Sequence, residues 1–259
     1  MAALSMLGEA TVEIVPCAVS AEVLAKVVGG DVDGAVLPIE NSLHGSVAEH
    51  YDLFFDEPVR IVREGLLHIR HNLIALPGVK LEEIKRVISH PVALSQCRKF
   101  LAAHPEFEVM PFYDTAGSVK HVMAEGLRDV AGVAPELAAR QYGGNVLVGG
   151  IEDHAENYTR FYLVERGNAE EGVSDAANKM SVAFTIEHRP GTLVAGLQRL
   201  AVEGVDLTRI ESRPVPGSPW EYVFYVDARF KDQGQAAAAV AALREHCRMV
   251  KVLGFYVAA

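Results

Sequence analysis

The sequence feature that most constrains the fold is a repeated order of apolar strand, polar turn and helix. Residues Gly34–Glu40 form a continuous apolar run, as in strands that are buried on both faces of a parallel sheet. A polar turn at 41–46 follows, and a helix is predicted from Val47 to about Phe55. The same order recurs in predicted strands at 86–89, 108–112 and 130–134. This alternation indicates an α/β sheet with right-handed crossovers.

The chain is expected to pass between two lobes. Before the repeat, Thr11–Val15 alternates as a strand and Ala18–Val28 is predicted as a helix capped by Ser20. Two later extended runs, Val59–Ile69 and 72–77, lead from the first lobe to the second. Residues 151–164 lead back. We therefore expect two lobes hinged about a cleft.

A separate unit follows the lobes. Gly167–Lys179 is polar, small and acidic, which predicts a linker. Beyond it, strands and helices follow in the order β-α-β-β-α-β over about 80 residues, which is the ferredoxin-like plan. The predicted elements are 180–187, 190–200, 205–213, 220–228, 235–247 and 249–257.

Composition narrows the class of function. The chain has 259 residues, a net charge of -10 and a pI near 5.5, which disfavours nonspecific binding to nucleic acid or to an anionic membrane. The apolar runs are shorter than a transmembrane helix, and the start does not resemble a secretory signal. Three widely spaced cysteines fit the cytoplasm, and Cys97 is expected to be a buried structural thiol.

One short stretch carries candidate chemistry. Asn157–Phe161 precedes an apolar run that is predicted as a short buried strand. Thr159 and Arg160 would then lie at the mouth of a strand, where open α/β sheets bind ligands. The alternative is that Thr159 only satisfies a loop and that Arg160 forms a structural ion pair.

Several motifs together resemble one family, prephenate dehydratase with a C-terminal ACT regulatory domain. In the lobes they are Leu37-Pro-Ile-Glu-Asn-Ser42 with Gly45-Ser46-Val47, His90-Pro-Val-Ala-Leu94 with Gln96-Cys97, Asp114-Thr-Ala116, Ala138-Ala139 with Tyr142-Gly143, and Asn157-Tyr-Thr-Arg-Phe161. In the last unit they are Ile210-Glu-Ser-Arg-Pro214 and Trp220-Glu-Tyr-Val-Phe-Tyr-Val-Asp227. Each is weak alone, but together they follow the family order across nearly the whole chain.

The resemblance implies a fold class. We expect an α/β protein with a two-lobed, periplasmic-binding-protein-like catalytic domain at 1–166 and a ferredoxin-like ACT domain at 178–259. The family normally opens with a strand and a Gly-rich turn, whereas this sequence starts inside the first helix, so that segment is expected to be missing. The effector motif also departs from the family, with Gly191-Thr192-Leu193 in place of Gly-Ala-Leu.

The resemblance also implies the reaction, in which prephenate loses carbon dioxide and hydroxide to give phenylpyruvate. Aromatisation drives it, so no cofactor and no metal is expected. Thr159 corresponds to the family threonine tied to dehydration and is expected to hydrogen-bond the departing oxygen. Asn41, Ser42 and Thr115 are predicted to hold carboxylates at helix N-termini, and Ser46 either joins them or caps the helix.

Arg160 is a candidate for pairing with a substrate carboxylate. Neighbouring residues on a strand point to opposite faces, however, so a structural ion pair is favoured for Arg160 over contact beside Thr159. His90 is expected to order the turn at Pro91. Glu40 is expected to brace the cleft, because its carboxylate would repel a dianion.

For the last unit, the resemblance implies that L-phenylalanine binds as the effector where two such domains meet, giving feedback inhibition in a homodimer or homotetramer. The candidate residues are Gly191, Thr192, Leu193, Glu211, Ser212, Arg213 and Pro214. Two alternatives remain open. One is the same chemistry on arogenate, and the other is a non-catalytic amino-acid-binding sensor.

Overall fold

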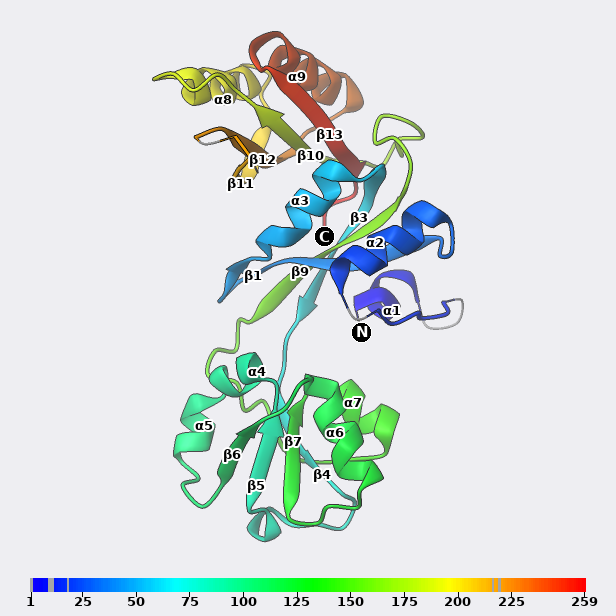
Figure 1. The fold of residues 1–259 in the computed structure, drawn as a ribbon, viewed down its shortest axis with the longest axis vertical. Helices are drawn as coiled ribbons and strands as arrows, with labels where there is room; N and C mark the ends of the chain where they lie inside the picture. Colours follow the sequence, from blue (N-terminus) through cyan, green and yellow to red (C-terminus); the bar gives the residue numbers. More distant parts are fainter. Residues whose placement is uncertain (1, 9–11, 18, 216, 219) are drawn as a thin grey trace. The chain divides into compact units, whose positions relative to one another are not determined.

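The computed structural model describes residues 2–8, 12–17, 19–215, 217–218 and 220–259. The chain divides into two compact units (Figure 1). One combines Met1–Leu67 with Thr159–Ala259, and the other is His68–Tyr158. The second unit is therefore an insertion in the first. No helix within the described ranges is long and apolar enough to cross a membrane.

The N-terminal part of the first unit is built on a sheet of order β2-β1-β9-β3. Its elements are α1 (Ala2–Leu7), α2 (Ser20–Gly29), β1 (Gly34–Asn41), β2 (Gly45–Ser46), α3 (Ala48–Asp56), β3 (Val59–His68) and β9 (Tyr158–Arg166). Because β9 pairs with β1, the expected return of residues 151–164 to the first lobe is confirmed.

Three local predictions for this part are wrong. β1 lies antiparallel to β9 with alternating burial, so it is not a strand of a parallel sheet that is buried on both faces. Residues 12–15 form no strand, and Thr11 lies outside the described residues. Ser20 does not cap α2, because Val19 is the N-cap and the Ser20 hydroxyl bonds to His50 Nε2 at 2.6 Å.

The C-terminal part of the first unit confirms the predicted β-α-β-β-α-β order. Its elements are β10 (Lys179–Thr185), α8 (Thr192–Val202), β11 (Asp206–Pro214), β12 (Tyr222–Arg229), α9 (Gln233–His246) and β13 (Met249–Tyr256). The antiparallel sheet has the order β11-β12-β10-β13. This arrangement is ferredoxin-like.

The two faces of this sheet have different partners. Apolar side chains on one face, including Val182 and Val226, form a core with α8 and α9. The opposite face contributes Ala183, Tyr225 and Leu253 to the core that also contains α3 and β1. The predicted linker is part of the fold as well, because Ala169 and Ala177 are buried in the α8–α9 core.

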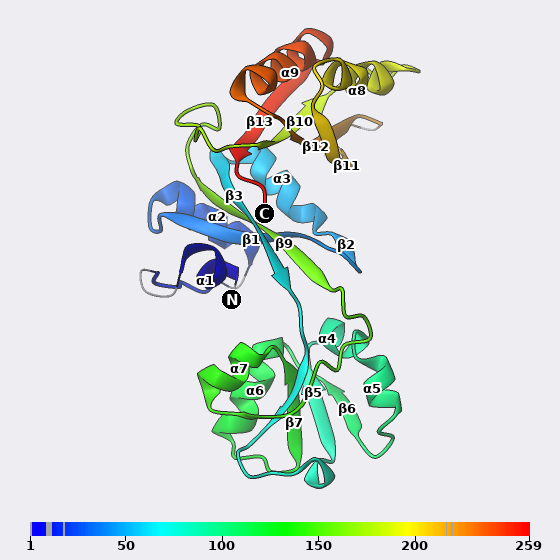
Figure 2. The same ribbon diagram turned by 180° about the vertical axis from the view of Figure 1, so that it is seen from behind.

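The second unit is a doubly wound sheet of order β6-β5-β7-β4-β8 (Figure 2). Its elements are β4 (Asn72–Ala75), η2 (Leu81–Glu83), β5 (Arg86–Ser89), α4 (Pro91–Ser95), α5 (Arg98–Ala102), β6 (Glu108–Pro111), α6 (Thr115–Ala124), β7 (Val130–Ala134), α7 (Glu136–Tyr142) and β8 (Asn145–Gly149). β5 runs parallel to β6 and β7, as predicted, whereas β4 runs antiparallel to β7 and β8.

Candidate active site

The antiparallel pair β1 and β9 brings the central candidate residues together. The register is regular up to Pro38, which lies opposite Phe161. One extra residue in β1, Ile39, then forms a β-bulge, and Asn41 comes to lie opposite Thr159. Residues directly opposite each other in a sheet share a face, so the amide and the hydroxyl meet.

A hydrogen bond joins these two side chains. Asn41 Nδ2 donates to Thr159 Oγ1 at 3.0 Å. The Asn41 carbonyl oxygen accepts the backbone N–H groups of Leu43 and His44 at 3.0 and 3.1 Å, and these bonds orient the amide. A threonine hydroxyl has one proton and two lone pairs. Because Thr159 accepts from Asn41, its own proton remains available for donation.

On the opposite face, Arg160 forms the structural ion pairs that were favoured for it. Its guanidinium lies 2.9 Å from Glu40 and 2.5 Å from Glu64. Burial lowers the pKa of Arg160, but the carboxylates of Glu64 and Glu40 outweigh that effect and raise it. Glu40 is thus a partner of this ion pair, and its expected bracing of the cleft stays a prediction.

The two serines are not gathered at a helix N-terminus. Ser42 lies exposed in the turn between β1 and β2, and Ser46 belongs to β2. α3 begins after Val47, without a side-chain cap. Ser46 Oγ instead donates to Glu211 at 2.7 Å and accepts from Arg209 at 3.2 Å. The expected cluster failed because β2 intervenes between the turn and α3.

In the second unit, Thr115 does begin a helix, as predicted. Asp114 caps α6 by accepting the N–H of Gly117 at 2.5 Å. Thr115 lies in a different unit from Asn41 and Thr159, and its surroundings are those of α6. His90 caps α4 by accepting the Val92 N–H at 3.2 Å, which confirms its turn-ordering role.

Cys97 is fully buried in the same unit, which confirms the prediction of a structural thiol. Burial raises its pKa to about 12, so the thiol is protonated and unreactive at neutral pH.

The predicted effector residues divide between two faces of the C-terminal sheet. Gly191, Thr192, Leu193 and Ser212 line a cavity of about 320 Å³ at the start of α8, together with the exposed Trp220. Trp220 has a φ of 68°, which is unusual for a residue that is not glycine.

The remaining effector candidates have other surroundings. Glu211 and Arg213 face away from this cavity. Glu211 contacts Ser46, and Arg213 pairs with Asp52 at 2.7 Å. Pro214 is exposed at the end of β11.

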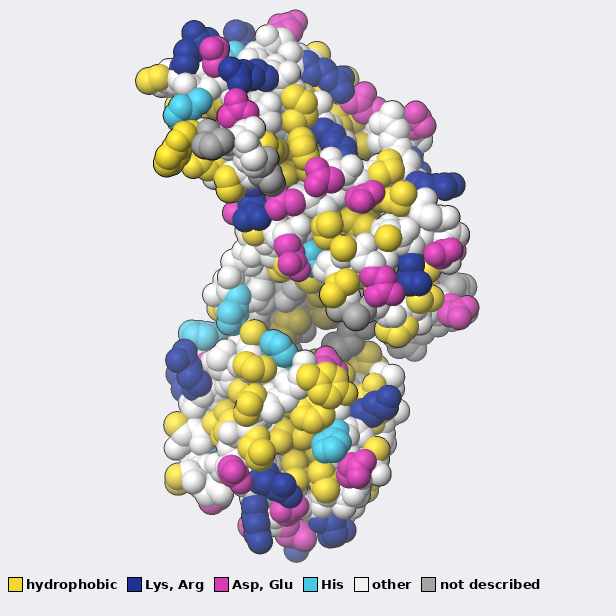
Figure 3. All heavy atoms as spheres, in the orientation of Figure 1, with side chains coloured by type: hydrophobic (Ala, Val, Ile, Leu, Met, Phe, Trp, Pro, Cys, Tyr) yellow, Lys and Arg dark blue, Asp and Glu magenta, His cyan; other side chains and the backbone are white. Residues whose placement is uncertain are grey.

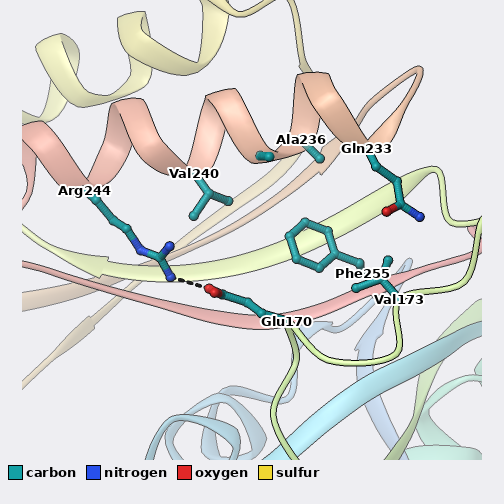
Figure 4. A pocket seen from close by; sticks show the side chains of 8 residues that line it. Glu170, Val173, Gln233, Ala236, Val240, Arg244 and Phe255 are labelled. Carbon is teal, nitrogen blue, oxygen red and sulfur yellow. Dashed lines mark hydrogen bonds and ion pairs between the residues drawn. The ribbon is translucent and has the colours of Figure 1, made fainter.

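A second cavity, of about 240 Å³, lies between α9, the end of β13 and the predicted linker (Figure 4). Val240 and Phe255 supply apolar surface, and Arg244 forms an ion pair with Glu170 at its edge. Sequence reasoning missed this cavity because the linker was expected to lie away from the core.

Sequence reasoning also missed several buried polar residues. Arg209 bonds to Glu40 across the two parts of the unit, and Lys179 bonds to Glu64 at 2.6 Å. Asp227 is 2% exposed and accepts from the Tyr162 hydroxyl at 2.9 Å. An ionisable residue within an apolar strand could have indicated these buried interactions, because a buried charge needs a partner.

Charge is mixed on the outer surface. Figure 3 shows basic side chains interspersed with acidic ones on the visible face of the described residues, without a continuous basic patch. The fold and the site therefore define a class: an α/β protein with an inserted doubly wound unit, a ferredoxin-like C-terminal part and a polar hydroxyl–amide site. The Asn41–Thr159 pair can hydrogen-bond a polar group of a ligand.

Comparison with known proteins identifies the family. A family model described as "Prephenate dehydratase" matches residues 1–169. The chain is 40% identical over 260 residues to "Arogenate dehydratase 2" of Petunia hybrida, covering 94% of this chain and 65% of that protein. The chain belongs to the prephenate dehydratase family. It spans slightly less than two thirds of the length of the first curated relatives it matches.

Two solved structures resemble the whole chain. The prephenate dehydratase of Arthrobacter aurescens in complex with L-Phe is 34% identical, with a TM-score of 0.87, covering 99% of this chain and 85% of that one. A protein titled "GqqA- a novel type of quorum quenching acylases" is 30% identical, with a TM-score of 0.89, covering 100% and 93%.

Proposed function

We propose that this protein is a prephenate dehydratase that forms phenylpyruvate for L-phenylalanine biosynthesis in the cytoplasm. The observation that carries the proposal is the hydrogen bond from Asn41 to Thr159. It holds a hydroxyl, with its proton available, at the start of β9. Family membership supports the same reaction. The domain limits proposed are 1–166 for catalysis and 178–259 for regulation.

In the proposed reaction, the bond between C1 and the carboxylate breaks and carbon dioxide leaves. The electron pair of the broken bond stays with the ring, completes the aromatic system and expels the oxygen at C4. That oxygen needs a proton to leave as water. Thr159 donates a hydrogen bond to that oxygen. A neutral threonine is a poor acid, so its main contribution is to position and polarise the leaving group.

Asn41 fixes the Thr159 hydroxyl, and Ser42 is proposed to bind a substrate carboxylate. Thr115 is proposed as a carboxylate-binding residue of the second unit. Ser46 and Arg160 already have protein partners at 2.7 and 2.5 Å. Their proposed part in substrate binding is therefore indirect: Ser46 shapes the turn between β1 and β2, and Arg160 shapes the start of β9.

The test compares Thr159→Val with Thr159→Ser. Loss of the hydroxyl at nearly constant volume is expected to lower kcat for prephenate by about 100- to 1,000-fold, as for removal of one hydrogen-bond donor to a developing charge. Serine restores most of the rate. Thr185→Val, on β10, is the matched control and stays near wild type.

A folded wild-type protein that binds prephenate without turnover would identify it as a sensor and contradict the proposed enzyme. Equal rates for Thr159→Val and the wild type would remove Thr159 from the mechanism. A quorum-quenching acylase assay is the appropriate parallel measurement, because one similar structure is described as that type of enzyme.

Arogenate is the second candidate substrate, because a relative with 40% identity is named as an arogenate dehydratase. Prephenate carries a keto group where arogenate carries an amino group. The ratio of kcat/KM for the two substrates decides between them.

L-Phenylalanine is proposed as a feedback inhibitor that binds in the cavity lined by Gly191, Thr192, Leu193 and Ser212. A similar solved structure is titled as a complex with L-Phe, which supports this choice. The C-terminal part is accordingly proposed to be an ACT domain, in a homodimer or homotetramer. The other effector candidates are Glu211, Arg213 and Pro214. They are proposed to influence effector binding indirectly, by fixing the position of β11.

A further inference from the structure

Arg209 on β11 is buried where the C-terminal sheet meets the first sheet. Its side chain is 7% exposed. Nε donates to Glu40 at 2.9 Å, and Nη2 donates to Ser46 at 3.2 Å and to Glu211 at 3.3 Å. Its guanidinium carbon also lies 4.2 Å from the centre of the Tyr51 ring. One side chain therefore contacts β1, β2 and α3.

The contact with Glu40 continues toward the candidate site. One carboxylate oxygen of Glu40 accepts from Arg209, and the other lies 2.9 Å from Arg160. Glu40 is thus held from two sides by two cations. The residues that follow Glu40 and precede Arg160 are Asn41 and Thr159, whose hydrogen bond forms the centre of the site.

The end of β1, which carries Asn41, depends on neighbouring elements to hold its position. β1 pairs with β9 on one side and with the two-residue strand β2 on the other. Arg209 contacts both β1 and β2, through Glu40 and Ser46. It therefore fixes both sides of the turn from which Asn41 projects.

We propose that Arg209 is a positioning residue for the dehydratase site, supplied by the C-terminal part of the chain. It holds Glu40 and Ser46, and thereby sets the geometry of Asn41 and Thr159 without touching the substrate. The effect on turnover rests on the proposed function, whereas the effect on the order of the turn does not. Without Arg209, the carboxylates of Glu40 and Glu211 lose a shared cation in a partly desolvated place.

The test compares Arg209→Met with Arg209→Lys. Methionine keeps much of the apolar length and removes the charge, so kcat is expected to fall about 10- to 100-fold, because misplacement of a catalytic group is costly. KM changes less than kcat. Lysine, which can still pair with Glu40 but lacks the planar fork, recovers part of the rate.

The matched control is Asp52→Asn. Asp52 lies on α3 and pairs with Arg213 across the same contact between the two parts of the unit, at 2.7 Å. Its loss weakens the interface without touching β1, and kcat is expected to stay within about twofold of wild type, as for an exposed ion pair. Glu40→Gln combined with Arg209→Met should cost less than the product of the single effects, because the two residues act as a unit.

A second measurement does not need turnover. Hydrogen exchange is followed in the peptide that spans residues 41–46, where the N–H groups of Leu43 and His44 bond to Asn41. Arg209→Met is expected to speed exchange there, and Asp52→Asn is not. A folded Arg209→Met protein with wild-type exchange in this peptide and wild-type kcat would overturn the inference. If the wild type lacks dehydratase activity, the proposed function fails, and exchange alone still decides the positioning role.

Discussion

Glu64 shows how a single residue holds a buried charge in this protein. Its side chain is 3% exposed and accepts from Lys179 at 2.6 Å, Arg160 at 2.5 Å and the N–H of Ala259 at 3.0 Å. Burial raises the pKa of Glu64, but the hydrogen bonds and the two positive charges together lower it below its ordinary value of 4.5. The carboxylate is therefore ionised when the chain is folded.

The Glu64→Gln variant is predicted to be less stable at neutral pH by about 3–5 kcal/mol, because Lys179 is left buried without its charge partner. A carboxyl group with a lowered pKa in the folded state stabilises above its unfolded pKa, and this stabilisation is lost as pH falls through the folded value. Wild type should therefore lose stability below about pH 4.5 more steeply than the variant.

Urea unfolding at pH 7, 5 and 3.5 measures this difference. Glu165→Gln is the control, because the Arg60–Glu165 pair is partly exposed, at 3.4 Å, and is expected to contribute less than about 1 kcal/mol. Parallel pH profiles for Glu64→Gln and the wild type would contradict the prediction.

Among the elements, β13 lies close against β3, in the other part of the first unit. Gly254 lies against Ile61 of β3, and an added Cβ would be 2.6 Å from the Ile61 Cβ and would overlap the Ile61 carbonyl oxygen. Further along, Val257 bridges to Arg63. The absence of a side chain at Gly254 is thus a condition for the contact between β13 and β3.

Gly254→Ala is predicted to destabilise the protein by about 1–3 kcal/mol or more, because a strand backbone cannot move aside without loss of pairing. Thermal unfolding measures this effect. Gly29→Ala, at the end of α2, is the control, because the nearest atom to its added Cβ is 3.8 Å away and alanine favours a helix. Unfolding temperatures that fall equally in both variants would exclude the proposed steric cause.

Local pattern predicted much of this element structure. The alternation of strands and helices gave the doubly wound sheet, and the β-α-β-β-α-β order gave the ferredoxin-like part. The pairing of β1 with β9 was missed, since Asn41 and Thr159 are 118 residues apart and local periodicity does not choose a distant strand partner. Ser46 was misjudged for the same reason, because its partner Glu211 is 165 residues away.

At the scale of the whole molecule, the two faces of β11 have different neighbours. Arg209 and Glu211 point toward the first sheet, while Ser212, next along the strand, lines the cavity proposed for L-phenylalanine. A ligand in that cavity can change activity only if it favours one position of β11 over another. Coupling of this kind is reciprocal, so substrate should change the affinity for the effector as well.

Trp220 offers a direct measurement of that binding. It is the chain's only tryptophan, is 75% exposed and lines the cavity. L-Phenylalanine is predicted to change its fluorescence in a saturable way, because ligand contact alters the solvation of the indole. Ala237→Met in the other cavity is the control and should leave the titration unchanged. Inhibition of turnover without any change in Trp220 emission would place the effector elsewhere.

The β-bulge at Ile39 makes the site sensitive to the length of the chain as well as to its composition. In a regular ladder continued past Pro38, Glu40 would lie opposite Thr159, and Asn41 would lose that partner. Insertion of one residue between Ile39 and Glu40, with the bulge retained, would likewise place the Glu40 carboxylate opposite the Thr159 hydroxyl while leaving every candidate site residue in the sequence. When relatives are aligned, an insertion within β1 is consequently as informative about activity as a substitution of Thr159 itself.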